Sequence, residues 1–110
     1  MTDDLDAEDA KLVTLARGAR ARIGAPQGAA VRDELGRTYA GASVARGSLV
    51  LSALELAVAQ AIASGARGLE CAVVCGDADL GIDAARELGG SGVPVIFVAP
   101  DGVVLHRETT

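Results

Sequence analysis

The chain has almost no aromatic side chains. Of its 110 residues only Tyr39 and Phe97 are aromatic, and tryptophan is absent. Binding platforms for single-stranded nucleic acid depend on aromatic rings on which the bases stack, so this class of site is excluded. A core is nevertheless available, because 50% of the residues are hydrophobic. It is built from Ala, Val, Leu and Ile, and such small side chains predict closely packed elements.

The chain also lacks net positive charge. Its formal net charge is −5, whereas phosphate binding needs Lys and Arg clustered on one face. Arg17, Arg20 and Arg22 lie on one predicted helix, but they are mixed with other residue types. We interpret them as a solvated face and expect no nucleic-acid partner.

No targeting segment is expected. The first eleven residues, MTDDLDAEDAK, are acidic and contain no apolar run of the kind found in signal peptides. The most apolar stretch, residues 49–65, is long enough to suggest a membrane span. It carries Glu55 and Gln60 without flanking anchor residues, which favours a buried helix. We expect a cytoplasmic protein that does not bind membranes, in which Cys71 and Cys75 are reduced.

The pattern along the chain predicts one domain over residues 1–110, with residues 1–7 frayed or disordered. An amphipathic helix is expected from residue 8 to 23. A β-hairpin with strands 29–32 and 37–44 follows. The remaining elements are a central helix at 49–65 with Ser48 as its N-cap, a strand at 69–75, a helix at 80–88, and strands at 93–99 and 103–106. The order α-β-β-α-β-α-β-β predicts an α/β fold in which helices cover both faces of a mixed sheet.

Short motifs in this order resemble the cytidine deaminase family. GAAV at 28–31 and GRTYAGASV at 36–44 are similar to the family's VGAAL and GxxYxGxNVE. PVIFVAPDG at 94–102 resembles its PVILVxxDG strand, and RETT at 107–110 resembles its closing RETT. The resemblance covers about residues 10–110. It implies a cytidine deaminase-like three-layer α/β/α sandwich.

The family's chemistry depends on zinc. A Cys or His at the start of the central helix and two Cys at the start of the next helix hold the metal, and a Glu shuttles protons. By resemblance, Glu55 takes the proton-shuttle position, while Ala53, Ile82 and Ala85 take the three ligand positions. None of these three side chains can coordinate zinc. The resemblance therefore implies a degenerate family member, for which we expect no cofactor.

The nucleoside contacts are altered as well. The family's Asn and Glu that hold the ribose correspond to Ser43 and Ala45, and its aromatic residue before VGAAL corresponds to the Pro26–Gln27 neighbourhood. We therefore predict a non-catalytic binding or scaffolding module that acts with an unidentified protein partner. We also expect a homodimer or homotetramer. Family members assemble through these helices, and a helix that is apolar nearly all round needs cover from a second chain.

Other interpretations remain open. The chain could be an active zinc-dependent deaminase that converts cytidine to uridine, if Cys71, Cys75 or His106 reached Glu55 as unconventional ligands. It could also be a nucleoside-binding sensor. As structural alternatives, Glu55 would pair with an Arg or face a polar cavity. The two cysteines would be buried thiols on one face of a strand.

Two further motifs are weaker. Asp77 and Asp79 could form a cation site, but a helix cap explains them more simply. The glycine-rich segment 89–92 lacks the Lys of a phosphate-binding loop, and we interpret it as a flexible connection.

Overall fold

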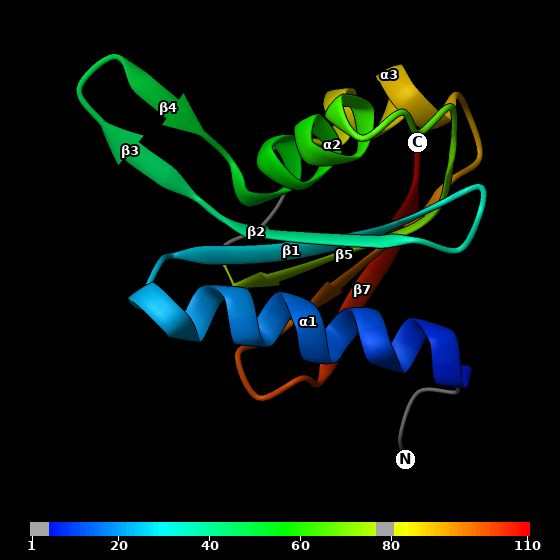
Figure 1. Cartoon of the computed structure of the whole chain (residues 1–110). Helices are drawn as coiled ribbons and strands as arrows, with labels where there is room; N and C mark the ends of the chain where they lie inside the picture. The colour runs from blue at the N-terminus through cyan, green and yellow to red at the C-terminus, as the bar shows by residue number, and fades with distance from the viewer. Residues whose placement is uncertain (1–4, 77–80) are drawn as a thin grey trace.

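A computed structural model describes residues 5–76 and 81–110 and shows a three-layer α/β/α fold. Helix α1 covers one face of the sheet, and α2 and α3 cover the other (Figure 1). The predicted element order is confirmed, with one additional hairpin. The elements are α1 (Ala7–Ile23), β1 (Gln27–Asp33), β2 (Thr38–Ala42), β3 (Val44–Arg46), β4 (Leu49–Leu51), α2 (Ala53–Ala63), β5 (Leu69–Gly76), α3 (Ile82–Gly89), β6 (Pro94–Val98) and β7 (Val104–Thr109).

The main sheet is mixed, as predicted. Its strand order is β2-β1-β5-β6-β7, so β2 and β7 form the two edges. Strands β5 and β6 are parallel to each other, whereas the described pairs β1–β2, β1–β5 and β6–β7 are antiparallel. Parallel neighbours require a crossover connection, and the segment containing α3 provides it.

Strand β5 separates the two halves of the core. Its residues Ala72 and Val74 belong to the apolar cluster beneath α2 and α3. Cys71, Val73 and Cys75 belong to the cluster beneath α1. This alternation follows from the two-residue period of a strand, and it confirms that both thiols lie buried on one face.

The expectation of a helix from residue 49 is wrong. Residues 49–51 form β4, which pairs antiparallel with β3. Gly47 and Ser48 form the two-residue loop between them, and Gly47 has φ +61°. Glycine at the first central position suits such a loop, since it adopts positive φ at little cost. We call residues 44–51 the β3–β4 arm; it projects away from the layers in Figure 1.

Helix α2 therefore begins later than predicted and is not buried on all sides. Ser52, rather than Ser48, is its N-cap. Glu55 is exposed, and Ile62 retains 50% of its accessible surface. Only one side is buried, through Ala53, Leu54, Ala57, Val58 and Ala61. Among the described helices none is long and apolar enough to cross a membrane.

The first hairpin closes on a buried carboxylate. The predicted turn at 33–36 is present, with Gly36 at φ +82°. Asp33 is 0% exposed and accepts hydrogen bonds from the N–H groups of Leu35 and Arg37, both at 2.9 Å. It also accepts from the Arg37 guanidinium at 2.8 Å and the Tyr39 hydroxyl at 2.9 Å. The turn is therefore fixed by side-chain contacts as well as by its glycine.

The first residues of α1 and α3 lie close to the predicted helix starts. Asp6 caps α1, with its carboxylate accepting from the Asp9 N–H at 2.8 Å, so this part of segment 1–7 is ordered against the helix. Helix α3 begins at Ile82, with Gly81 as its N-cap. Asp77 and Asp79, which the sequence suggested as a cation site or helix cap, lie outside the described residues.

Candidate functional site

A pocket of about 250 Å³ lies where β1 begins and β2 ends, beside the first turn of α2. The β3–β4 arm forms one of its walls. Its lining residues are Pro26, Gln27, Ser43, Val44, Ala45, Val50, Leu51 and Ser52. Ser43 and Ala45, the two positions that the sequence assigned to ribose contact, both line this pocket, so the fold brings them together.

Gln27 joins three elements at the pocket. It is only 3% exposed, and its side-chain oxygen accepts a hydrogen bond from the Ala53 N–H at 3.3 Å. Its own N–H donates to Ser43 Oγ at 3.2 Å, and its carbonyl accepts from the Ser43 N–H at 3.0 Å. The Gln27 side chain thus binds one of the N–H groups that a helix start leaves without an intrahelical partner.

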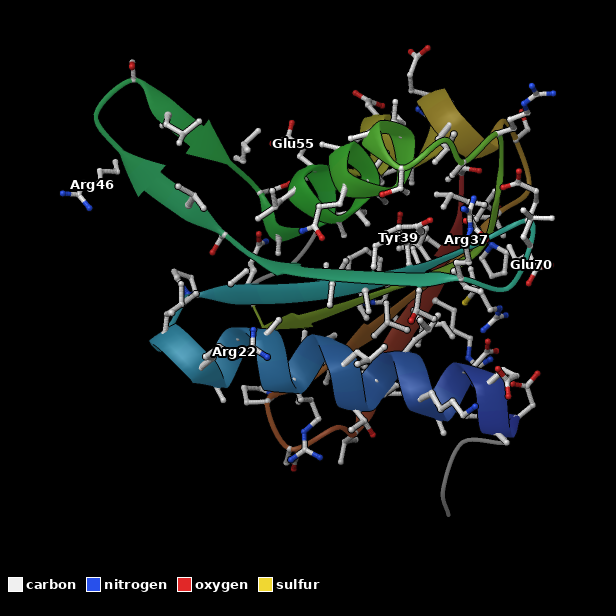
Figure 2. The ribbon with its side chains drawn as sticks, viewed as in Figure 1. Arg22, Arg37, Tyr39, Arg46, Glu55 and Glu70 are labelled. Carbon is white, nitrogen blue, oxygen red and sulfur yellow. The ribbon has the colours of Figure 1, made fainter. Side chains whose placement is uncertain are left out.

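Glu55 forms a capping box with Ser52. Its carboxylate accepts from the Ser52 N–H at 2.8 Å, and its own N–H donates to Ser52 Oγ at 3.0 Å. Figure 2 shows Glu55 on the first turn of α2, with Arg46 far away on the arm. The structural role of Glu55 is therefore a reciprocal cap, not the predicted pairing with an Arg.

The start of α3 lies directly against the start of α2. A Cβ atom added to Gly81 would stand 2.6 Å from Ser52 Oγ and 3.0 Å from Leu54 Cβ. The first distance is shorter than real Cβ contacts and the second is unusually tight, so this close approach favours glycine. Gly81 also has φ +103°, a conformation that favours glycine. The two helix N-termini thus meet beside the pocket, as the family resemblance implies.

The residues at this junction do not fit zinc. Ala53 and Ala85 are fully buried in the apolar cluster, and Ile82 packs against that cluster. Methyl and alkyl groups carry no lone pair that could bind a metal. Within residues 5–76 and 81–110, no three His, Cys, Asp or Glu side chains come together as a possible metal site. The space between the two helices is packed as hydrophobic core.

The unconventional ligands considered from the sequence do not converge on Glu55. Cys71 and Cys75 lie beneath α1, on the sheet face opposite to α2. Burial, with the nearby charge of Asp9, raises the pKa of the Cys71 thiol to about 12, and burial also raises the pKa of Cys75. His106 lies on edge strand β7, where its ring stacks on the ring of Phe97 from strand β6. Its Nε2 lies 2.9 Å from the carboxylate of Glu108. The thiols are therefore protonated core groups near neutral pH.

The roles of two residues of this site were not predicted from the sequence. Ser52 had a recognisable signal, because Ser followed three residues later by Glu, ahead of an apolar run, is a capping-box pattern. For Gln27 the resemblance indicated only the neighbourhood of a lost aromatic contact. Its hydrogen bond with Ala53, 26 residues away in the sequence, had no sequence signal. Its role becomes visible only once β1 and α2 are placed together.

Comparison with known proteins agrees with this geometry. A sequence model described as "Cytidine deaminase-like" matches residues 5–102. The fold resembles a crystal structure of cytidine deaminase from Burkholderia pseudomallei, with a TM-score of 0.76, 25% identity, and coverage of 91% of this chain and 89% of that one. It also resembles cytidine deaminase from Mycobacterium leprae, with a TM-score of 0.71, 23% identity and 94% coverage of both chains. For a mutant cytidine deaminase from Mycobacterium tuberculosis the TM-score is 0.68, with 24% identity and coverage of 86% of this chain and 85% of that one. A search of curated proteins finds no match.

Proposed function

The chain belongs to the cytidine deaminase-like family, and from this premise we propose that it is a non-catalytic member that binds a ligand or partner at the α2 pocket. One observation carries the proposal: at the junction of α2 and α3, Ala53 and Ala85 are buried core side chains and Ile82 packs against them as a partly buried one. A metal-activated water is what the family's reaction needs, and these residues offer no ligand for the metal.

The state of Glu55 supports the same conclusion. A general base must lie within hydrogen-bond reach of the proton it removes, and its reaction needs an activated nucleophile. Here the Glu55 carboxylate accepts a hydrogen bond from the Ser52 N–H at 2.8 Å. Helix capping alone explains a Glu at this position, and no catalytic function has to be assigned to it.

Deamination is the direct test. Incubating the full chain with cytidine in zinc-supplemented buffer is expected to give no uridine above the buffer rate. Turnover that disappears in Glu55→Gln would contradict the proposal. This variant suits the test because Gln at this position of a capping box can also accept the N-cap hydrogen bond, so the fold is preserved.

We also propose that the protein is a cytoplasmic homodimer or homotetramer without a nucleic-acid partner. The support is the exposed apolar surface on α1 and on the β3–β4 arm. Ile23 at the end of α1 is 67% exposed, and Leu49 on the β3–β4 arm, which does not line the α2 pocket, is 57% exposed. Ile23 and Val44 line one groove, so the end of α1 and the base of the arm are neighbours. Apolar surface of this kind is typical of contact with another molecule.

A further inference from the structure

We propose that the pocket beside α2 takes a small, neutral and mostly apolar molecule instead of a nucleoside. The inference rests on the proposed binding function and specifies its ligand class. Pro26, Val44, Val50 and Leu51 supply apolar walls from the body and from the arm. Val50 is left 66% exposed. A ligand that covers this side chain removes apolar surface from water, which favours binding.

The polar groups of the pocket already have partners within the chain. The Gln27 side-chain oxygen accepts from Ala53, Ser52 Oγ accepts from Glu55, and Ser43 Oγ accepts from the Gln27 N–H. None of the eight described lining residues is charged. A bound ribose would lose the hydrogen bonds that its hydroxyl groups make with water, and no carboxylate of the described lining residues replaces them. Polar groups that are buried without a hydrogen-bond partner are costly.

The size of the pocket limits the ligand further. Its volume of about 250 Å³ lies just below the usual range for ligand pockets, about 300–1,000 Å³. A compound of two or three fused or linked rings fits such a volume. The Ser43 hydroxyl donates to the Gln27 carbonyl at 3.5 Å. The Ser52 hydroxyl accepts from the Glu55 N–H and has one hydrogen left to donate, which suits a ligand with a single polar edge.

The test uses N-phenyl-1-naphthylamine, a neutral aromatic probe whose fluorescence increases in apolar surroundings. Titration into the full chain is expected to give saturable binding of one probe per chain, unchanged at high salt because the probe is uncharged. Val50→Asp is expected to weaken binding by at least about tenfold. Ala45→Asp, which faces Val50 across the arm, gives an independent second variant.

Leu35→Asp is the matched control. Leu35 is 71% exposed and lies in the β1–β2 turn, outside the pocket. It introduces the same charge into an equally exposed apolar position, and probe binding should not change. Circular dichroism melts show whether each variant folds. Equal loss in Val50→Asp and Leu35→Asp, or an absence of saturable binding, would overturn the inference.

Two further outcomes would assign the pocket to another occupant. Displacement of the probe by cytidine at comparable concentration would identify a nucleoside site and contradict the inference. Probe fluorescence and light-scattering mass can also be followed together as the protein concentration increases. If the fluorescence falls while the mass rises, a second copy of the chain occupies the pocket, which would likewise contradict the inference. If the probe does not bind and cytidine is not deaminated, the proposal of a non-catalytic family member still stands. Zinc-dependent turnover would instead remove the proposed function itself.

Discussion

Asp33 shows how a single buried charge is held in this molecule. Burial alone would raise the pKa of its carboxyl group, but the N–H groups of Arg37 and Leu35, the Tyr39 hydroxyl and the Arg37 guanidinium outweigh burial and hold the pKa below its usual range. Burial and the hydrogen bond to Asp33 correspondingly raise the pKa of Tyr39. The ionised carboxylate therefore contributes to folding stability at neutral pH.

Replacing this carboxylate should be costly. Asp33→Asn is expected to lower the free energy of unfolding at pH 7 by about 2 kcal/mol, since hydrogen bonds to a charged group are lost. The folded-state pKa is below the unfolded value, so the wild-type contribution is complete above about pH 3.9 and is lost as the pH falls through the lower folded pKa. Urea denaturation of both proteins should show their difference shrinking on acidification.

Asp83→Asn provides the control for that measurement. Asp83 forms a salt bridge with Arg86 at 2.7 Å, but its side chain is almost fully exposed. Exposed ion pairs contribute little, so this variant should unfold like the wild type. An Asp33→Asn protein as stable as wild type at pH 7 would show that the carboxylate cluster does not stabilise the hairpin.

At the scale of elements, the position where α2 begins is determined by local contacts between Ser52 and Glu55. Ser52→Ala removes the side chain that accepts the Glu55 N–H, and loss of such a cap costs about 1 kcal/mol. Ser48→Ala changes only the two-residue loop of the β3–β4 arm, and its stability should match wild type. Urea denaturation distinguishes the two. A larger loss in Ser48→Ala would place the helix start where the sequence first suggested it.

The limits of sequence-based prediction are clearest at this same junction. Residues 49–51 are an uninterrupted apolar run that leads into the apolar side of α2, and such a run does not distinguish strand from helix by periodicity. The Gly47–Ser48 pair between two short runs was a hairpin signal of the recognised type. The buried strands β5 and β6 were predicted well, because each is a short apolar run bounded by glycine-rich segments.

At the scale of the whole molecule, the order of elements was sufficient to predict the α/β/α layers, and the short motifs to predict the family. The pocket was not predictable in the same way. It depends on Gln27 contacting Ala53 and on residues of the β3–β4 arm lining one side, beside Pro26 and Gln27. Ser43 and Ala45 line this pocket, and the sequence singled them out only through the motif that carries the resemblance.

The oligomeric state is a prediction at this scale. We expect static light scattering to give a mass of two or four chains, because exposed apolar side chains on α1 and the β3–β4 arm gain cover in an assembly. Leu49→Glu, on the arm, should shift the mass toward one chain. A wild-type mass equal to one chain, constant over the accessible concentrations, would contradict this prediction.

The central claim is that the junction of α2 and α3 holds hydrophobic core in place of a metal. Zinc per chain, measured by elemental analysis on untagged protein purified without chelator, tests it most directly. The account predicts far less than one zinc per chain, since Ala53, Ile82 and Ala85 offer no ligand. One zinc per chain that survives dialysis would contradict it, and would mean that other residues form a metal site.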